Sequence, residues 1–129
     1  MDILREDARV SFVEIAERVK LSEAAVRRRV SNLVASGAIR RFTIELNDSD
    51  LTSAIIFVSV NPSNPTSEVS KSIRGVAGVE TIYETTGQFD IAAILKGASI
   101  GEVNKSVEDI RRLSGVLNTN TMIVLHTIR

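Results

Sequence analysis

The chain has 129 residues, of which 43% are hydrophobic and 25% are charged, a balance typical of folded globular proteins and not of disordered chains. Its net charge is zero and it has no cysteine, so disulfides, thiolate nucleophiles and cysteine-based zinc sites are excluded. No secretory signal is visible and no apolar run approaches the ~18 residues that a membrane span needs, so we expect a cytoplasmic protein. Aromatic residues are only 4% of the chain, which argues against recognition of single strands by base stacking.

The first 20 residues predict two short helices. Ile3 and Leu4 are the apolar part of a first helix within residues 1–6. Ser11 and Glu14 then form a capping box, in which each side chain satisfies a backbone N–H at the start of the second helix. The buried side of the second helix follows from apolar residues at helical spacing, which are Phe12, Ile15, Ala16 and Val19.

A tight connection leads into the most informative stretch, residues 21–41. Ser22 is a good N-cap for a third helix, and Gly37 is a good stop because a left-handed backbone carries no Cβ penalty there. The apolar stripe of this helix consists of Val26, Val30, Leu33 and Val34. Arg28 is expected on the side opposite to the stripe, with Arg27 and Arg29 flanking it.

Positive charge is concentrated on the third helix and just after it. Residues 24–44 contain five arginines and no Asp or Glu, although residues 1–46 carry a net charge of only +2. A solvated helix face normally mixes signs to gain i,i+4 ion pairs, so an acid-free stretch favours an anionic partner. Two helices joined by a short turn, the second one basic, predict a helix-turn-helix that places its second helix in the major groove of DNA. The alternative is a basic surface helix without a partner.

The DNA-binding prediction divides the arginines by role. Arg28 is the best candidate for reading base edges, whereas Arg29, Arg40 and Arg41 are expected at phosphates. Residues 38–46 alternate as a strand, which predicts a wing or a lead into a hinge, and the last two arginines there could equally be solvated edge charges. The predicted DNA-binding residues are Ser22, Glu23, Ala24, Arg27, Arg28, Arg29, Arg40 and Arg41.

The second half of the chain repeats one pattern. The sequence EVSKSI at residues 68–73 is echoed by EVNKSV at 102–107. Each unit reads as strand, helix, strand, and two such units in tandem predict a four-stranded sheet with both helices on one face. The predicted strands are residues 53–60, 79–86, 89–96 and 116–128, and the predicted helices are residues 67–74 and 99–113.

The predicted fold is α+β, an N-terminal (winged) helix-turn-helix followed by a ferredoxin-like βαββαβ domain. Residues 47–50 are polar and turn-rich, which makes them the best candidate for the domain boundary. The predicted domains are a DNA-binding helix-turn-helix at 1–46, a hinge at 47–52, and a ferredoxin-like effector-binding and oligomerisation domain at 53–129.

Three of the predicted strands are apolar on both sides, which leaves one face of the sheet without cover. A lone domain would expose this patch to water, so we expect a homodimer that pairs sheet to sheet. Two helix-turn-helix heads on a two-fold axis would then read half-sites about one helical turn apart, or a multiple of that distance.

Polar residues in the second half could bind a small amino acid. The Asp90 carboxylate could take its ammonium group, and hydroxyl or N–H donors around Thr119 could take its carboxylate. The alternative is that Gly87 and Gln88 form only a hairpin turn. The predicted effector-binding residues are Tyr83, Thr86, Gly87, Gln88, Phe89, Asp90, Thr119, Asn120 and Thr121.

Short motifs occur in a recognisable order along the whole chain. In the first half they are Asp7-Ala8-Arg9, Glu14-Ile15-Ala16, Leu21-Ser22, Arg28-Arg29-Val30, Leu33, Gly37 and Ile39-Arg40, and in the second half Thr86-Gly87-Gln88-Phe89-Asp90 and Leu113-x-Gly115-Val116. This order resembles the Lrp/AsnC ("feast/famine") family of bacterial and archaeal transcription regulators. Ser114 stands where the family has proline, and the first helix is shorter than is usual there. The resemblance implies sequence-specific binding of double-stranded DNA, octamers of four dimers, and an amino-acid effector where dimers meet, with no other cofactor.

An enzyme is not expected from these residues. His126 is the only imidazole, so a Ser–His–acid triad would depend on a residue near the end of the chain. No carboxylate pair or metal-ligand cluster has a convincing spacing. Two alternatives remain open: a tetrapyrrole (siroheme-type) decarboxylase of similar fold, and a metabolite sensor that does not bind DNA.

Overall fold

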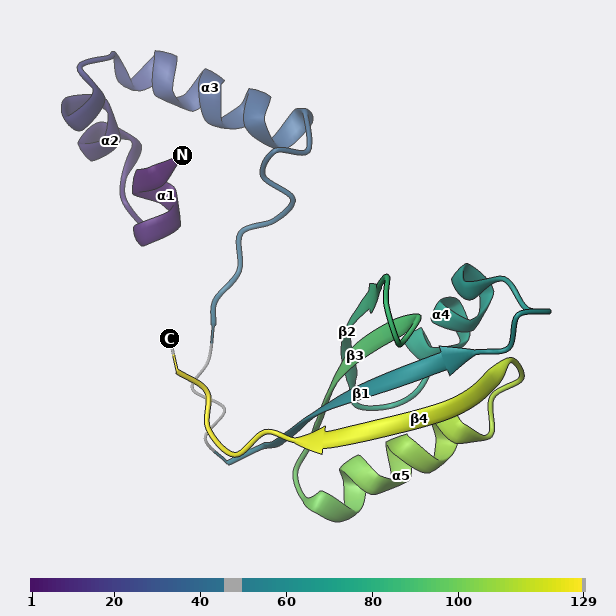
Figure 1. The fold of residues 1–129 in the computed structure, drawn as a ribbon. Helices are drawn as coiled ribbons and strands as arrows, with labels where there is room; N and C mark the ends of the chain where they lie inside the picture. Colours follow the sequence, from purple (N-terminus) through teal and green to yellow (C-terminus); the bar gives the residue numbers. More distant parts are fainter. Residues whose placement is uncertain (46–49, 129) are drawn as a thin grey trace. The chain divides into compact units, whose positions relative to one another are not determined.

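The chain forms two compact units, Met1–Leu46 and Asn47–Arg129, each of which has its own core (Figure 1). The computed structural model describes residues 1–45 and 50–128. Residues 47–49, which belong both to the boundary predicted at 47–50 and to the hinge predicted at 47–52, lie outside this described part.

Residues 1–45 of the first unit contain three helices: α1 (Asp2–Glu6), α2 (Phe12–Val19) and α3 (Glu23–Ala35) (Figure 1). Their order and positions confirm the predicted helix-turn-helix, in which α2 and α3 pack on each other. The buried core consists of Ile15, Ala16, Val26 and Val30, against which Ile3, Leu4, Val10, Phe12 and Leu21 pack.

The ends of α3 follow the sequence prediction. The Ser22 hydroxyl accepts a hydrogen bond from the Ala25 N–H at 3.2 Å, so it caps the first turn. The helix ends before Gly37, whose φ of +74° is a left-handed stop. Charged and small side chains between these two points are therefore displayed on a helix with fixed ends.

Two predictions about the first unit are wrong. Val19 and Val34 were expected in the buried stripes, but they are 43% and 46% exposed, because crossing helices cover only the residues near their contact. The strand predicted at residues 38–46 is absent over 38–45, so the described residues form no wing. Alternating apolar residues do not make a strand without a partner to accept their hydrogen bonds, and Phe42 and Ile44 stay exposed.

Residues 50–128 of the second unit form a four-stranded antiparallel sheet with two helices (Figure 1). The sheet order β2-β3-β1-β4 with helices after β1 and β3 confirms the predicted ferredoxin-like βαββαβ fold. The elements are β1 (Thr52–Val60), α4 (Thr66–Arg74), β2 (Val79–Glu84), β3 (Ile91–Gly97), α5 (Ile100–Arg111) and β4 (Val116–Ile123).

Two details of this unit differ from the prediction. The last strand ends at Ile123 and not at residue 128, because its partner β1 begins at Thr52 and the final hydrogen bond to it is donated by the Val124 N–H to the Ser53 carbonyl oxygen at 2.9 Å. The connection between β2 and β3 is a loop of residues 85–90 and not a two-residue turn. This loop is closed by the Thr85 N–H, which donates to the carbonyl oxygen of Asp90 at 2.8 Å.

Alternation along the strands separates the two faces of the sheet. Ala54, Ile56 and Val58 on β1 are buried and pack with residues of α4 and α5, so both helices cover the same face. The other face of the sheet is not covered by any helix among the described residues of this unit. Its apolar side chains are Ile55, Phe57, Tyr83, Ile94 and Met122.

Candidate functional site

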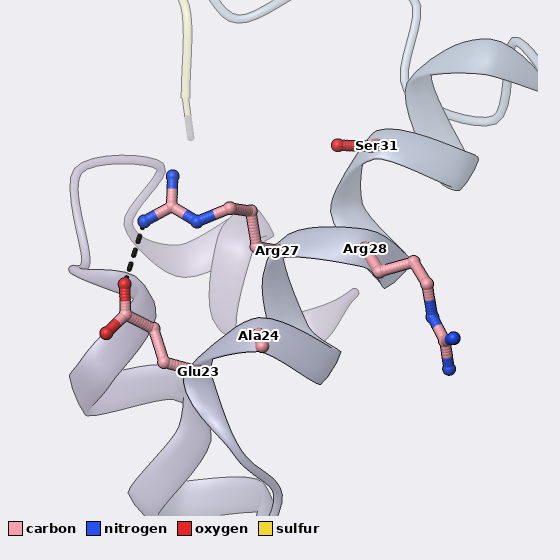
Figure 2. A pocket seen from close by; sticks show the side chains of 5 residues that line it. All are labelled: Glu23, Ala24, Arg27, Arg28 and Ser31. Atoms are coloured by element: carbon pink, nitrogen blue, oxygen red, sulfur yellow. Dashed lines mark hydrogen bonds and ion pairs between the residues drawn. The ribbon is translucent and has the colours of Figure 1, made fainter.

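The outward face of α3 contains an open hollow of about 530 Å³ (Figure 2). It begins at the capped first turn and follows the helix for two turns, and its lining combines one carboxylate, two guanidinium groups and small side chains. Five residues line it, namely Glu23, Ala24, Arg27, Arg28 and Ser31. The buried Val26 and Val30 lie on the other side of the helix, so the hollow faces away from the core.

Arg27 is held by two contacts. Its Nη2 lies 2.7 Å from Oε1 of Glu23, one helical turn earlier (Figure 2). Its guanidinium carbon lies 4.9 Å from the centre of the Phe12 ring on α2. The acid-free stretch therefore has a carboxylate at its border that pairs with its first arginine, and Arg27 does not stand alone as a free cation.

Arg28 differs from its neighbour in this respect. Its side chain extends away from the Glu23–Arg27 pair (Figure 2). Within the described residues, Arg28 and Arg29 make no ion pair or side-chain hydrogen bond, and both are exposed. Their charges are consequently available to an anionic partner that approaches α3 from outside.

Arg40 and Arg41 lie beyond the end of α3. Both are exposed, and they belong to residues 38–45, which form neither helix nor strand. They do not line the hollow on α3. The structure thus gathers part of the predicted DNA-binding set on one helix face and leaves these two arginines on the segment that follows it.

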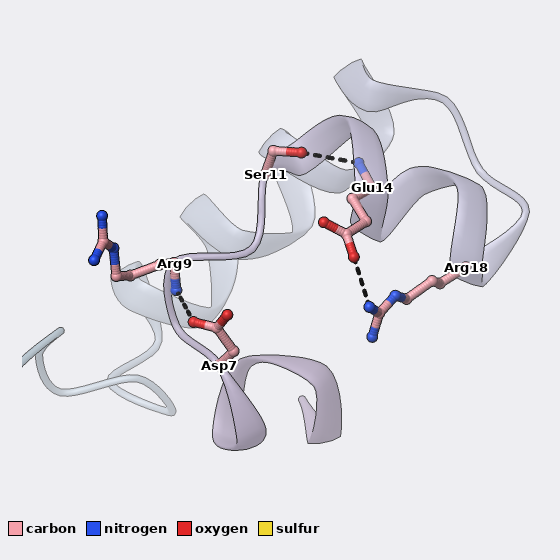
Figure 3. Close-up of polar contacts among 5 residues, drawn as sticks. All are labelled: Asp7, Arg9, Ser11, Glu14 and Arg18. Carbon is pink, nitrogen blue, oxygen red and sulfur yellow. Dashed lines mark hydrogen bonds and ion pairs between the residues drawn. The ribbon is translucent and has the colours of Figure 1, made fainter.

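The helix α2 begins at Phe12, whose ring contacts Arg27, and Figure 3 shows the polar contacts around the start of this helix. At its start, the Ser11 hydroxyl accepts from the Glu14 N–H at 3.1 Å, which confirms the serine half of the predicted capping box. The glutamate half is wrong, because the Glu14 carboxylate accepts from Arg18 at 2.5 Å instead of from the N-cap backbone. Upstream, Asp7 accepts from the Arg9 N–H at 2.8 Å and shapes the turn between α1 and α2.

Two contributors to this face are absent from the predicted set. Ser31 lines the hollow, and its spacing of seven residues from Ala24 is the signal that would have included it. Phe12 was expected only in the core, yet its ring also makes a cation–π contact with Arg27. Its second role depends on how α2 and α3 cross, for which the sequence offers no signal.

Some predicted effector residues share the uncovered face of the sheet. Tyr83 pairs with Ala92, Ala92 with Phe57, and Phe57 with Asn120, so these four form one row across the strands. Phe89 from the 85–90 loop joins this row, because its ring centre is 5.2 Å from that of Phe57. Tyr83 and Asn120 nevertheless lie on opposite edge strands.

Other predicted effector residues point to the helix-covered face. The Thr119 hydroxyl accepts from Nε of Arg111 on α5 at 3.0 Å. The Thr121 hydroxyl is buried without a hydrogen-bond partner among the described residues. Arg111 is therefore a polar neighbour that the sequence analysis missed, since helix and strand meet there only through the tertiary fold.

The loop residues are partly engaged by the fold itself. One carboxylate oxygen of Asp90 accepts from the Val60 N–H at 2.7 Å, which leaves its second oxygen for another partner. Thr86, Gly87 and Gln88 are exposed. A single copy of the chain does not gather all nine predicted effector residues around one cavity.

Across residues 1–45 and 50–128, no group of three or more His, Cys, Asp or Glu side chains could hold a metal ion. None of the helices in that part of the chain has the length and apolar character required to cross a bilayer.

Comparisons with known proteins agree over both units. Residues 1–34 match the AsnC-type helix-turn-helix domain, and residues 53–129 match the Lrp/AsnC ligand binding domain. The chain is 47% identical to the HTH-type transcriptional regulator LysM of Sulfurisphaera tokodaii, over 97% of this chain and 89% of that protein. It is 42% identical to the regulator of the same name from Saccharolobus solfataricus, over 98% and 89% of the two chains.

Solved structures give the same result for the fold. A feast or famine regulatory protein from M. tuberculosis complexed with L-methionine superposes with a TM-score of 0.91 at 26% identity, covering 99% of this chain and 88% of that one. A transcriptional regulator from Neisseria meningitidis, in complex with L-Met, superposes with a TM-score of 0.87 at 26% identity, covering 98% and 86%.

Proposed function

This chain belongs to the Lrp/AsnC family of transcriptional regulators, with a helix-turn-helix domain and a ligand-binding domain, and from that premise we propose that it binds specific duplex sequences through α3 under the control of a small amino acid. Its relatives are regulators and not enzymes, so the decarboxylase alternative is set aside. A metabolite sensor that does not bind DNA remains the second candidate function. For the DNA-binding regulator, the proposed place of action is the cytoplasm, where its DNA target would lie.

One observation carries the DNA proposal: on the outward face of α3, Arg28 lines an open hollow and has no side-chain partner among the described residues. An arginine in the major groove can donate two hydrogen bonds to O6 and N7 of guanine, which makes Arg28 the proposed base reader. Arg29, Arg40 and Arg41 are the proposed phosphate contacts, because they are exposed and lie beside or after the same helix. Ser22, at the capped start of α3, and Ala24 are proposed to lie near the groove floor.

The effector proposal rests on chemistry and on two relatives. Both the M. tuberculosis and the N. meningitidis proteins were crystallised with L-methionine. We propose that the second oxygen of Asp90 receives the ammonium group of an amino acid, and that donors near Thr119 receive its carboxylate. Because one copy does not gather these residues around one cavity, the proposed site is completed where dimers meet.

The uncovered face of the sheet supports a proposal about how copies of the chain assemble. Ile55, Phe57, Ile94 and Met122 are large apolar side chains on that face, and a second copy pairing sheet to sheet would remove them from water. We propose a homodimer formed in this way, with four dimers in an octamer. The dimer would carry two copies of α3 to two half-sites on one duplex.

The test is selection of bound duplexes from a random pool, with and without a mixture of amino acids. The proposal predicts enrichment of one pseudo-palindromic sequence, and an affinity that falls steeply with salt as each phosphate contact contributes about −0.9 to the log–log slope. Amino acids are expected to change the affinity or the recovered sequence. Failure to enrich any sequence, with no salt-dependent binding, would favour the DNA-free sensor.

A further inference from the structure

The Glu23–Arg27 pair lies on the face proposed to meet DNA, and the inference drawn from it rests on that proposed function. We propose that Glu23 is a specificity-determining residue of this regulator. Its carboxylate holds Arg27 against α2, so that of the two arginines that line the hollow only Arg28 is free to meet a duplex. Glu23 acts through Arg27 and is in that sense a positioning residue.

The geometry restrains Arg27 from two directions. The ion pair of 2.7 Å runs along α3 and links residues one turn apart. The contact of 4.9 Å with the Phe12 ring runs from α3 to α2. An exposed ion pair is weak by itself, and the Glu23 and Arg27 side chains are 47% and 62% exposed. The aromatic ring adds a second attraction that favours the same position of the guanidinium group.

This position changes what Arg27 can contribute to binding. A free arginine beside DNA displaces counterions from any phosphate that it contacts, and the resulting gain in binding free energy does not depend on the DNA sequence. Arg27 paired with a carboxylate contributes less of that gain, and the carboxylate itself is repelled by phosphates. Non-specific affinity is therefore lowered more than the affinity for a sequence that Arg28 reads through base edges.

The experiment is a double-mutant cycle on the full chain with Glu23→Gln, Arg27→Gln and the double variant. Binding to a selected duplex and to a scrambled duplex of equal length is measured across salt. Glu23→Gln should tighten binding to the scrambled duplex more than to the selected one, and steepen its salt slope by about one as Arg27 becomes free. In the Arg27→Gln background, Glu23→Gln should leave the selected-to-scrambled ratio unchanged.

Glu14→Gln is the matched control. Glu14 and Arg18 form an i,i+4 pair on α2 with side chains 48% and 51% exposed, so this substitution removes the same charge from the same unit (Figure 3). We expect it to leave the ratio unchanged. Both substituted positions are exposed and glutamine is a good helix former, so both variants should fold.

Three results would overturn the inference. The first is a selected-to-scrambled affinity ratio that Glu23→Gln leaves unchanged, and the second is a fall of this ratio in Glu14→Gln that equals the fall in Glu23→Gln. The third is a change of the ratio by Glu23→Gln that is the same with and without Arg27. The wild-type chain tests the proposed function separately. If it binds neither duplex in a salt-dependent way, the proposed function fails and this inference fails with it. If it binds the selected duplex tightly while the variants behave as in those three results, only the role of Glu23 is lost.

Discussion

Arg28 and Arg41 are both exposed arginines of the first unit, yet they differ in what surrounds them. Arg28 borders a hollow on a helix with fixed ends, whereas Arg41 lies on a segment without regular structure. A side chain that extends from a rigid helix is suited to directed contacts with the edges of DNA bases. A charge on a segment without helix or strand is suited to phosphates, which can be approached from many directions.

We predict that Arg28→Ala lowers the affinity for the selected duplex by about 1–3 kcal/mol and relaxes the sequence preference, because a bidentate base contact is lost. Arg41→Ala should weaken binding to all duplexes alike and reduce the salt slope by about one. Competition binding with selected and scrambled duplexes at several salt concentrations measures both effects. Equal, small losses for the two variants would contradict this division of roles.

At the residue scale, features that depend on local helix geometry were predicted correctly, whereas contacts that depend on the tertiary fold were not. The caps at Ser11 and Ser22 were predictable because a side chain and a backbone N–H three residues later are fixed by helix geometry. The pairing of Arg27 with Phe12 was not, since it requires the crossing of two helices. Likewise, the strand register that sends Thr119 to one face and Asn120 to the other is set by pairing with β1.

Gly115 fixes the turn that leads from α5 into β4. Its φ is +88°, and a Cβ at this position would lie 2.7 Å from Cγ2 of Val69 on α4 and 3.0 Å from Cγ of Asn64. Val69 is part of the buried core and cannot yield without disturbing it. The close packing of the two repeats at this point therefore requires glycine.

We predict that Gly115→Ala destabilises the protein by about 2–4 kcal/mol, because overpacking adds to a left-handed backbone that alanine resists. Gly101→Ala is the control. Gly101 is in α5, and its Cβ would meet only the Ser99 hydroxyl at an ordinary 3.6 Å, so alanine should stabilise by about 0.5 kcal/mol. Urea unfolding followed by circular dichroism measures both. Equal stability of the two variants would show that the turn relaxes around the added methyl group.

At the element scale, helices and strands that bury an apolar side were predictable to within a few residues. The repeated strand–helix–strand pattern is an example, since each element has its own hydrophobic period. Segments without a buried partner were the failures. Residues 38–45 alternate without forming a strand, and the last strand stops at Ile123 because its partner β1 begins at Thr52. Hydrogen-bond partners are a property of the fold and cannot be read from one segment.

The uncovered sheet face is an exposed apolar surface of the second unit. Ile94 pairs with Ile55, and Ile55 pairs with Met122, so three large apolar side chains stand in one row across the strands. Burial of such a row against a second copy would supply a major part of the association energy, since each square ångström of apolar surface contributes roughly 25 cal/mol. This makes the face a direct test of the proposed assembly.

We predict that Ile94→Glu yields a folded monomer, because a carboxylate in the proposed interface would be buried without a partner. Sedimentation equilibrium measures the change, and affinity for a two-site duplex should fall because the two heads no longer bind together. Ile100→Glu is the control, since Ile100 is 65% exposed at the start of α5, away from this face. A wild-type monomer, or an Ile94→Glu dimer, would contradict sheet-to-sheet pairing.

At the scale of the whole molecule, the two folds were predictable because each unit contains a complete core within its own stretch of sequence. The effector site stays a prediction. Of its residues, Phe89 and Asn120 lie on one face beside Phe57, which the prediction did not include, whereas Tyr83 lies on the far edge strand and one oxygen of Asp90 accepts from the Val60 N–H. Sites that two or more copies complete depend on surfaces whose pairing no single sequence specifies.

The bond between Asp90 and the Val60 amide has a mechanical meaning for any ligand of the 85–90 loop. If the proposed ligand binds there, its cation and the last amide of β1 would share one carboxylate, so binding would act directly on the main chain of a central strand without a moving lid. That strand borders both β3 and β4, which are the two strands that a shift of its last residues would reach first.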